Sequence, residues 1–176
     1  MNGRSPDKKK STNPLAAALK LLARRPHSCA ELRRALTRKF RSCEAVDEAI
    51  ARLRALGYLD DRKFAVQYAS MLARSRGFGR ERIRRELRAK FVENAAIDAA
   101  LDTAFAETGE RDLLDRALEK KLRTLRLPLT RPRFYALCQS LMRLGFRSDD
   151  IMKAVRSRPE LKPLSGAIES IESLDD

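Results

Sequence analysis

The sequence predicts an all-α protein of three tandem three-helix repeats that form a curved, elongated array. Apolar residues recur at helical spacing through most of the chain. Aromatic residues make up only 6% of the 176 residues and Trp is absent, so aliphatic side chains and alanine must fill the core, a mixture that favours helices. The same order of apolar positions is also found three times, which is typical of a repeat protein.

The first predicted helix follows a polar, basic stretch. Residues 1–13 have no apolar period, which predicts a disordered arm. Asn13 can cap the helix that follows, and Pro14 suits its first position. The inward face of this helix is predicted to contain Leu15, Ala18, Leu19 and Leu22.

Two further helices complete the first repeat, residues 14–59. Ser28 and Glu31 have the capping-box spacing, in which each side chain satisfies a backbone N–H at the helix start. Gly57 can adopt the left-handed conformation that ends a helix, and Asp60-Asp61 can cap the next one. The predicted inward residues are Leu32, Leu36 and Phe40 in the second helix, and Val46, Ile50, Leu53 and Leu56 in the third, which follows Ser42.

The second and third repeats are predicted over residues 60–108 and 109–158. In the second, Ile83, Leu87 and Phe91 lie 51 residues after Leu32, Leu36 and Phe40, and Ile97 and Leu101 match Val46 and Ile50. In the third, Cys138, Met142 and Phe146 take those places 55 residues further on, before Ile151 and Val155; its first helix has Leu114, Ala117, Leu118, Leu122 and Leu125 inward. Residues 159–176 are acidic and are predicted to be a disordered tail.

The most specific motif spans the boundary between the first two repeats. It consists of Gly57-Tyr58-Leu59-Asp60-Asp61, Phe64-Ala65, Tyr68, Arg76-Gly77, Gly79, Arg82-Ile83, Leu87 and Lys90. This order resembles the central signature of the RecX family of bacterial regulators, which bind the RecA recombinase filament. Phe91 departs from the signature, because the family pattern has glycine after the lysine.

The resemblance implies a non-enzymatic regulator of homologous recombination and the SOS response. Such a protein would lodge in the groove of the RecA filament on single-stranded DNA and bridge neighbouring subunits. It would inhibit ATP hydrolysis, strand exchange and the co-protease activity that cleaves the LexA repressor. The implied partners are the RecA filament, the single-stranded DNA within it and free DNA, and we expect the chain to act as a monomer.

The charge of the chain is consistent with an anionic partner. The net charge is +14, and basic clusters recur in all three repeats. The helical projection places Arg85 opposite Ile83 and Leu87, with Arg82 and Arg88 to either side of it, and all three are predicted to face solvent. The candidate binding residues are Arg24, Arg25, Arg34 and Arg38 in the first repeat, Arg74, Arg76, Arg80, Arg82, Arg84, Arg85, Arg88 and Lys90 in the second, and Lys120, Lys121, Arg123 and Arg126 in the third.

This pattern leaves the partner open. Arginine binds phosphate and carboxylate groups alike, so the clusters could contact a nucleic-acid backbone or an acidic protein surface. A run of charges can also be no more than a solvated face. The alternative to the filament regulator is a sequence-tolerant DNA- or RNA-binding protein of helix-turn-helix-like units, since a three-helix unit with a basic second or third helix fits that class.

Nothing in the sequence predicts a catalytic, cofactor or metal site. Cys29, Cys43 and Cys138 lack a CxxC spacing and have only His27 as a possible companion, so we expect free thiols in a reducing cytosol. Adjacent aspartates at 60–61 and 149–150 fit helix starts better than an acid–base pair. No apolar run approaches the ~18 residues of a membrane span, so we expect a cytoplasmic protein.

Overall fold

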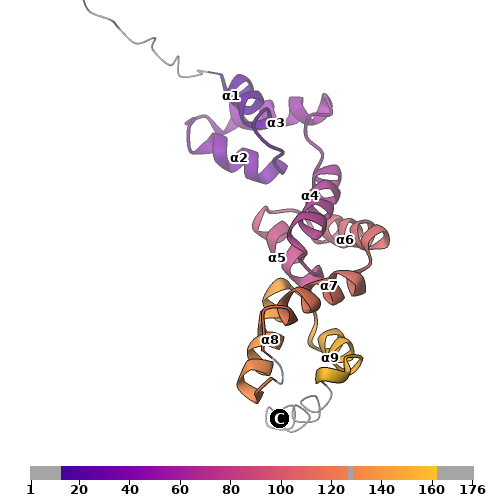
Figure 1. Cartoon of the computed structure of the whole chain (residues 1–176). Coiled ribbons are helices and arrows are strands. Elements are labelled where there is room, and N and C mark those ends of the chain that lie inside the picture. Colours follow the sequence, from indigo (N-terminus) through magenta and orange to yellow (C-terminus); the bar gives the residue numbers. More distant parts are fainter. Residues whose placement is uncertain (1–12, 127–128, 162–176) are drawn as a thin grey trace, which may run out of the picture.

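The computed structural model describes residues 13–126 and 129–161, and this part of the chain contains helices and no strand. The predicted all-α class is therefore confirmed. Figure 1 shows an elongated molecule with α1–α3 at one end, α4–α6 in the middle and α7–α9 at the other end. The helices are α1 (Pro14–Leu22), α2 (Cys29–Thr37), α3 (Cys43–Ala55), α4 (Asp61–Arg76), α5 (Arg80–Ala89), α6 (Asn94–Thr108), α7 (Glu110–Leu122), α8 (Arg131–Leu144), α9 (Ser148–Arg156) and the short 3-10 helix η1 (Pro159–Leu161).

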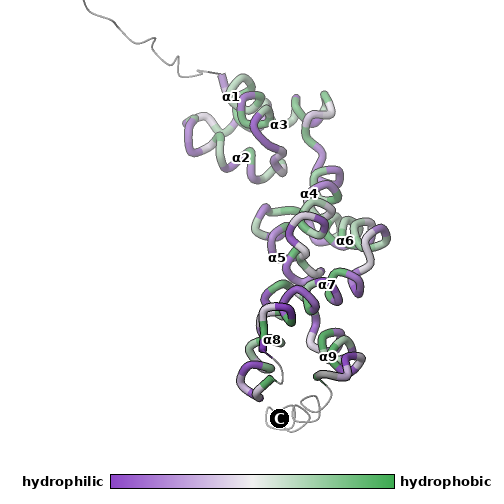
Figure 2. Tube along the Cα trace, viewed as in Figure 1, coloured by the Kyte–Doolittle hydropathy of each residue, from purple (hydrophilic) through white to green (hydrophobic). Residues whose placement is uncertain are grey.

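Local side-chain caps start several helices where the sequence predicts them. Asn13 Oδ1 accepts from the Leu15 N–H at 2.8 Å, and Asp60 Oδ1 accepts from two backbone N–H groups at 2.9 and 3.0 Å. Gly57 has a φ of 75° at the end of α3, as predicted. In Figure 2 hydrophobic and hydrophilic residues alternate within individual helices, as amphipathic packing requires.

Helices α1–α3 enclose a hydrophobic cluster of their own. Leu32, Leu36 and Leu53 are fully buried in it. Two residues predicted to face inward are not part of this cluster: Leu19 is 42% exposed and Leu56 is 59% exposed. Alanines 17 and 18 form the buried face of α1 in place of Leu19. Leu56 is the C-cap of α3, where the chain already turns away from the core.

Helices α4–α9 and η1 share a second, continuous cluster, which runs from Phe64 to Leu161. The corner between α4 and α5 touches the corner between α8 and α9 through backbone atoms. Gly79 N–H donates to the Leu144 carbonyl at 2.9 Å, and a Cβ on Gly79 would lie 2.6 Å from the Gly145 oxygen. Glycine at both corners therefore permits the close approach that joins α4–α6 to α7–α9.

Phe91 is not an inward residue, contrary to the prediction. It is 50% exposed and has a φ of 59°, while the next residue, Val92, is buried. Helix α5 ends with the Val92 N–H donating to the Leu87 carbonyl at 3.2 Å, so the left-handed residue before Val92 points its side chain outward.

The predicted match of the third repeat to the second is wrong by one residue in α8, although Cys138 and Phe146 are buried as predicted. Met142 is 42% exposed, whereas Leu137 and Leu141 are buried. Helix α8 ends like α5, with Gly145 in the left-handed conformation and the Phe146 N–H donating to the Leu141 carbonyl. Gly145 thus matches Phe91, and the offset between the two repeats is 54 residues rather than 55.

The first residues of the predicted disordered tail are ordered, contrary to the prediction. Residues 159–161 form η1, and Leu161 is fully buried against the core of α4–α9. The predictions for residues 1–12 and 162–176 lie outside the described residues.

Candidate basic interface

The predicted basic residues fall into two groups once their partners are known. In the first group each side chain forms an ion pair with a carboxylate, which offsets positive charge locally. A cation held in this way adds little to the attraction of an anionic partner. The members of this group are Arg25, Arg74, Arg80, Arg82, Arg84, Lys90 and Arg123.

Arg80 is the clearest member of the paired group. Its Nη1 lies 2.8 Å from Asp102 of α6 and its Nε 3.3 Å from Glu110 of α7. Its guanidinium also lies 5.1 Å from the ring centre of Phe105. Arg80 therefore connects three helices, which makes it a structural residue of the α5–α7 corner.

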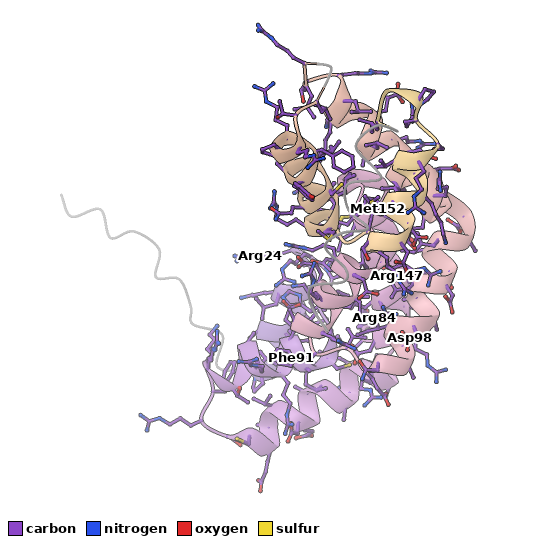
Figure 3. All side chains as sticks on the ribbon, turned by 90° about the horizontal axis from the view of Figure 1, so that it is seen from below. Arg24, Arg84, Phe91, Asp98, Arg147 and Met152 are labelled. Atoms are coloured by element: carbon purple, nitrogen blue, oxygen red, sulfur yellow. The ribbon has the colours of Figure 1, made fainter. Side chains whose placement is uncertain are left out.

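Arg84 and Arg82 are partly engaged as well. Arg84 bonds to Glu81 and Asp98 at 2.8 and 3.0 Å, and Figure 3 shows Arg84 and Asp98 lying next to one another. Arg82 bonds to Glu86 and is 41% exposed, less than the helical projection predicts. The reason is tertiary: Gly145 packs directly against the backbone of Arg82.

The second group forms no ion pair within the described residues. Arg34 and Arg38 are exposed on α2, and Arg85 and Arg88 are exposed on α5. Arg88 donates to the Asn94 amide oxygen at 3.3 Å but meets no carboxylate there. The whole group is Arg24, Arg34, Arg38, Arg76, Arg85, Arg88, Lys120, Lys121 and Arg126.

A polar junction brings the basic faces of α2 and α5 together. Ser28 Oγ donates to the Lys90 carbonyl, and the Cys29 N–H donates to Asp61 Oδ1 at 2.7 Å. These contacts leave the Arg34 guanidinium 4.5 Å from the centre of the Phe91 ring. Arg34 of the first repeat and Phe91 of the second thus lie side by side at the junction.

Glu31 is the centre of this junction. Its carboxylate accepts two bonds from Arg25 and one from Lys90, each at 2.9 Å. Burial opposes the charge and raises the pKa of Glu31, but the hydrogen bonds and charges of Arg25 and Lys90 outweigh burial and lower the pKa to about 2. The Glu31 carboxylate therefore stays ionised at every physiological pH.

The predicted capping box is only half formed. Ser28 Oγ accepts from the Glu31 N–H at 3.1 Å, as expected. The Glu31 carboxylate binds Arg25 and Lys90 instead of the Ser28 N–H, because charge-assisted bonds are stronger than a bond to a neutral donor.

The described residues contain no cluster of three or more His, Cys, Asp or Glu side chains that could hold a metal ion. All three cysteines are free. Burial raises the pKa of Cys29 to about 11, with Asp61 adding to the effect, and burial also raises the pKa of Cys138. Neither thiol is thus prepared to act as a nucleophile. No described helix is both long and apolar enough to cross a membrane.

The sequence did not predict Phe91 as a surface residue of the basic face formed by α2 and α5. The available signal was its position where the family pattern has glycine, because a residue there must adopt positive φ and cannot continue the helix inward.

The fold and the surface define an all-helical repeat protein with a basic face. Family models match two parts of the chain: the first three-helix domain of RecX at residues 15–53 and the second at residues 60–101. The chain belongs to the RecX family. The regulatory protein RecX of Chlorobaculum tepidum is 39% identical over 119 residues, covering 68% of this chain and 72% of the relative. That of Stenotrophomonas maltophilia is 36% identical over 162 residues, covering 84% and 88%.

Solved structures agree on the fold. The crystal structure of RecX from Lactobacillus salivarius superposes with a TM-score of 0.72 at 19% identity and covers 85% of this chain and 95% of that one. A second crystal structure of regulatory protein RecX gives 0.67 at 24% identity, with coverages of 85% and 78%. The prediction of an array of three-helix repeats is confirmed by this agreement.

Proposed function

We propose that this chain binds the RecA filament on single-stranded DNA and inhibits its ATPase, strand-exchange and co-protease activities. Membership of a family of regulatory proteins is the observation that carries the proposal. Regulation of this kind needs no chemistry, since a ligand that prefers one state of a filament shifts the population towards that state. The proposal implies action in the bacterial cytoplasm as a monomer without a cofactor.

The free arginines of α2 and α5 are the proposed centre of the binding surface. Arg34, Arg38, Arg85 and Arg88 are exposed and form no ion pair within residues 13–126 and 129–161. Guanidinium groups bind phosphates and carboxylates in a bidentate manner, so this face can contact DNA, RecA or both. We retain the paired residues of the predicted set as secondary contacts, because an exposed pair can exchange its carboxylate for that of a partner.

The two units α1–α3 and α4–α9 suggest how an elongated chain could contact neighbouring filament subunits. Each has its own hydrophobic cluster, and the polar junction at Glu31 joins them. We propose that the predicted repeat boundaries, 14–59, 60–108 and 109–158, mark three successive contact units. The last two would act as one rigid body because their core is shared.

One alternative function is supported by a specific observation. The unpaired arginines could bind the backbone of free DNA or RNA without RecA, and such binding would weaken steeply with salt. This is the sequence-tolerant nucleic-acid-binding protein that the sequence leaves open.

The test compares two charge-reversal variants in the DNA-dependent ATPase assay of RecA. The first carries Arg34→Glu, Arg85→Glu and Arg88→Glu on the proposed face. The control carries Arg62→Glu, Arg116→Glu and Arg143→Glu, exposed residues that also form no ion pair with the described residues. Both should fold normally because exposed substitutions cost little stability. We expect the first variant to lose most of its inhibition and the control to keep it.

The two functions separate in a salt series on bare DNA. A filament regulator inhibits RecA at concentrations where it occupies little bare DNA at physiological salt. A general nucleic-acid-binding protein binds bare DNA strongly, and its effect on RecA disappears when excess DNA removes the competition for strands. Equal inhibition by the first variant and the wild type would overturn the proposed surface.

A further inference from the structure

Phe91 has a conformation that its own side chain disfavours. Among the described residues it is the only non-glycine with positive φ, at 59°. In that region the Cβ crowds the backbone, which glycine avoids. The ring is also 50% exposed, while Val92 beside it fills the core. Folding alone therefore gives no reason for a large aromatic side chain at this position, and strain of this kind is found at functional sites.

The ring lies at the seam between two repeats. The Arg34 guanidinium of α2 lies over it, 4.5 Å from the ring centre, although Phe91 itself follows α5. Figure 3 shows Phe91 where the ribbons of these two segments meet. Arg34 lies over one face of the ring, and half of the Phe91 side chain nevertheless remains exposed. The ring is therefore an accessible apolar surface with a cation beside it.

The surroundings of the ring are basic. Arg88 is three residues before Phe91 and is exposed, and Arg38 lies one turn beyond Arg34 on the same face of α2. The nearby Glu31 is already neutralised by Arg25 and Lys90. An aromatic ring that anchors a protein partner is usually the centre of an apolar patch. A ring among free arginines instead fits a ligand that alternates flat rings with phosphates.

We propose that Phe91 is a stacking platform for an unpaired base of single-stranded nucleic acid, with Arg34, Arg38 and Arg88 binding the flanking phosphates. Base stacking on aromatic side chains accepts any base, and arginine adds a cation–π contribution. The inference deepens the proposed function, because it names the residue at which the chain would meet the single strand.

The experiment measures binding to an oligothymidylate and to an abasic oligonucleotide of equal length, both without RecA and at low ionic strength. The two probes carry the same phosphates, so their difference in affinity reports the bases. We expect the wild type to prefer the oligothymidylate at least about fivefold, the lower end of what one stacked base contributes. Phe91→Gly should lose most of this preference and bind the abasic probe as before.

Two properties of the variants keep the result interpretable. Phe91→Gly relieves the strained φ, so it should unfold at the same or a higher temperature than the wild type. Phe91→Trp should keep the preference, and because the chain has no other Trp, the fluorescence of the introduced indole reports position 91 alone. Quenching by the oligothymidylate but not by the abasic probe would show stacking directly. Tyr58→Ala, which removes a ring that is 63% exposed, should leave the preference unchanged.

Three results would overturn the inference: no binding of oligothymidylate at low ionic strength, an unchanged preference in Phe91→Gly, or an indole signal that responds to RecA without DNA but not to the strand. The last would show that the ring contacts protein. Because the two oligonucleotide-binding measurements omit RecA, a negative result in either would leave inhibition of the RecA ATPase by the wild type intact. If the wild type did not inhibit the RecA ATPase, the proposed function would be overturned instead.

Discussion

Replacing Glu31 by glutamine would remove the charge at the centre of the junction between α2 and α5. The glutamine keeps the shape of the side chain but can no longer form ion pairs with Arg25 and Lys90. The pKa of Glu31 is lowered from 4.5 to about 2, and at about 1.4 kcal/mol per pH unit this difference is worth at most about 3 kcal/mol of folding free energy. Arg25 is 51% exposed, and solvent screening reduces the expected loss to about 1–2 kcal/mol.

The pH dependence follows from the direction of this change. Since the pKa of Glu31 is lower in the folded state, its stabilisation is complete above about pH 4.5 and is lost as the pH falls towards 2. Urea unfolding should therefore show a difference of about 1–2 kcal/mol between the wild type and Glu31→Gln at pH 7. That difference should shrink below pH 4.5. All other carboxyl groups are present in both proteins, so their contributions cancel in the difference between the two unfolding free energies.

Glu48→Gln is the matched control, because Glu48 is exposed on α3 and forms no ion pair with the described residues. Its effect should stay within about 0.5 kcal/mol at every pH. If Glu31→Gln cost the same at pH 3 as at pH 7, the loss would come from packing and not from charge, and the ion-pair reasoning would be refuted.

Two further predictions concern packing and thiol chemistry. Gly145→Ala should lower the free energy of urea unfolding by about 2 kcal/mol or more, because its Cβ would lie 2.3 Å from a backbone nitrogen of α5 at a φ of 97°. Gly57→Ala has open space around it and should cost only the strain of positive φ, about 1 kcal/mol, in the same assay. A disulfide reagent at pH 8 should modify the exposed Cys43 first. Cys29 and Cys138 should react slowly, because burial raises the pKa of both of these thiols. Equal rates of modification of the three cysteines, measured by mass spectrometry, would contradict this prediction.

The sequence alone determined the features that depend on neighbouring residues. Asn13, Ser42 and Asp60 cap helices because each hydrogen bond spans two or three residues. Helical class followed from apolar periodicity, and family membership from the ordered signature around Gly57. The basic character of the surface was also predictable, because composition and helical projection need no long-range contact.

Only the tertiary structure decided which basic residues are free and where the repeats join. Arg80 and Lys90 bind carboxylates that lie 30 and 59 residues away, a distance that no local pattern encodes. The fusion of α4–α9 into one core likewise depended on the approach of Gly79 to Gly145. Periodicity shows which face of a helix is buried, whereas the partner of a charge or of a close backbone contact depends on how distant segments pack.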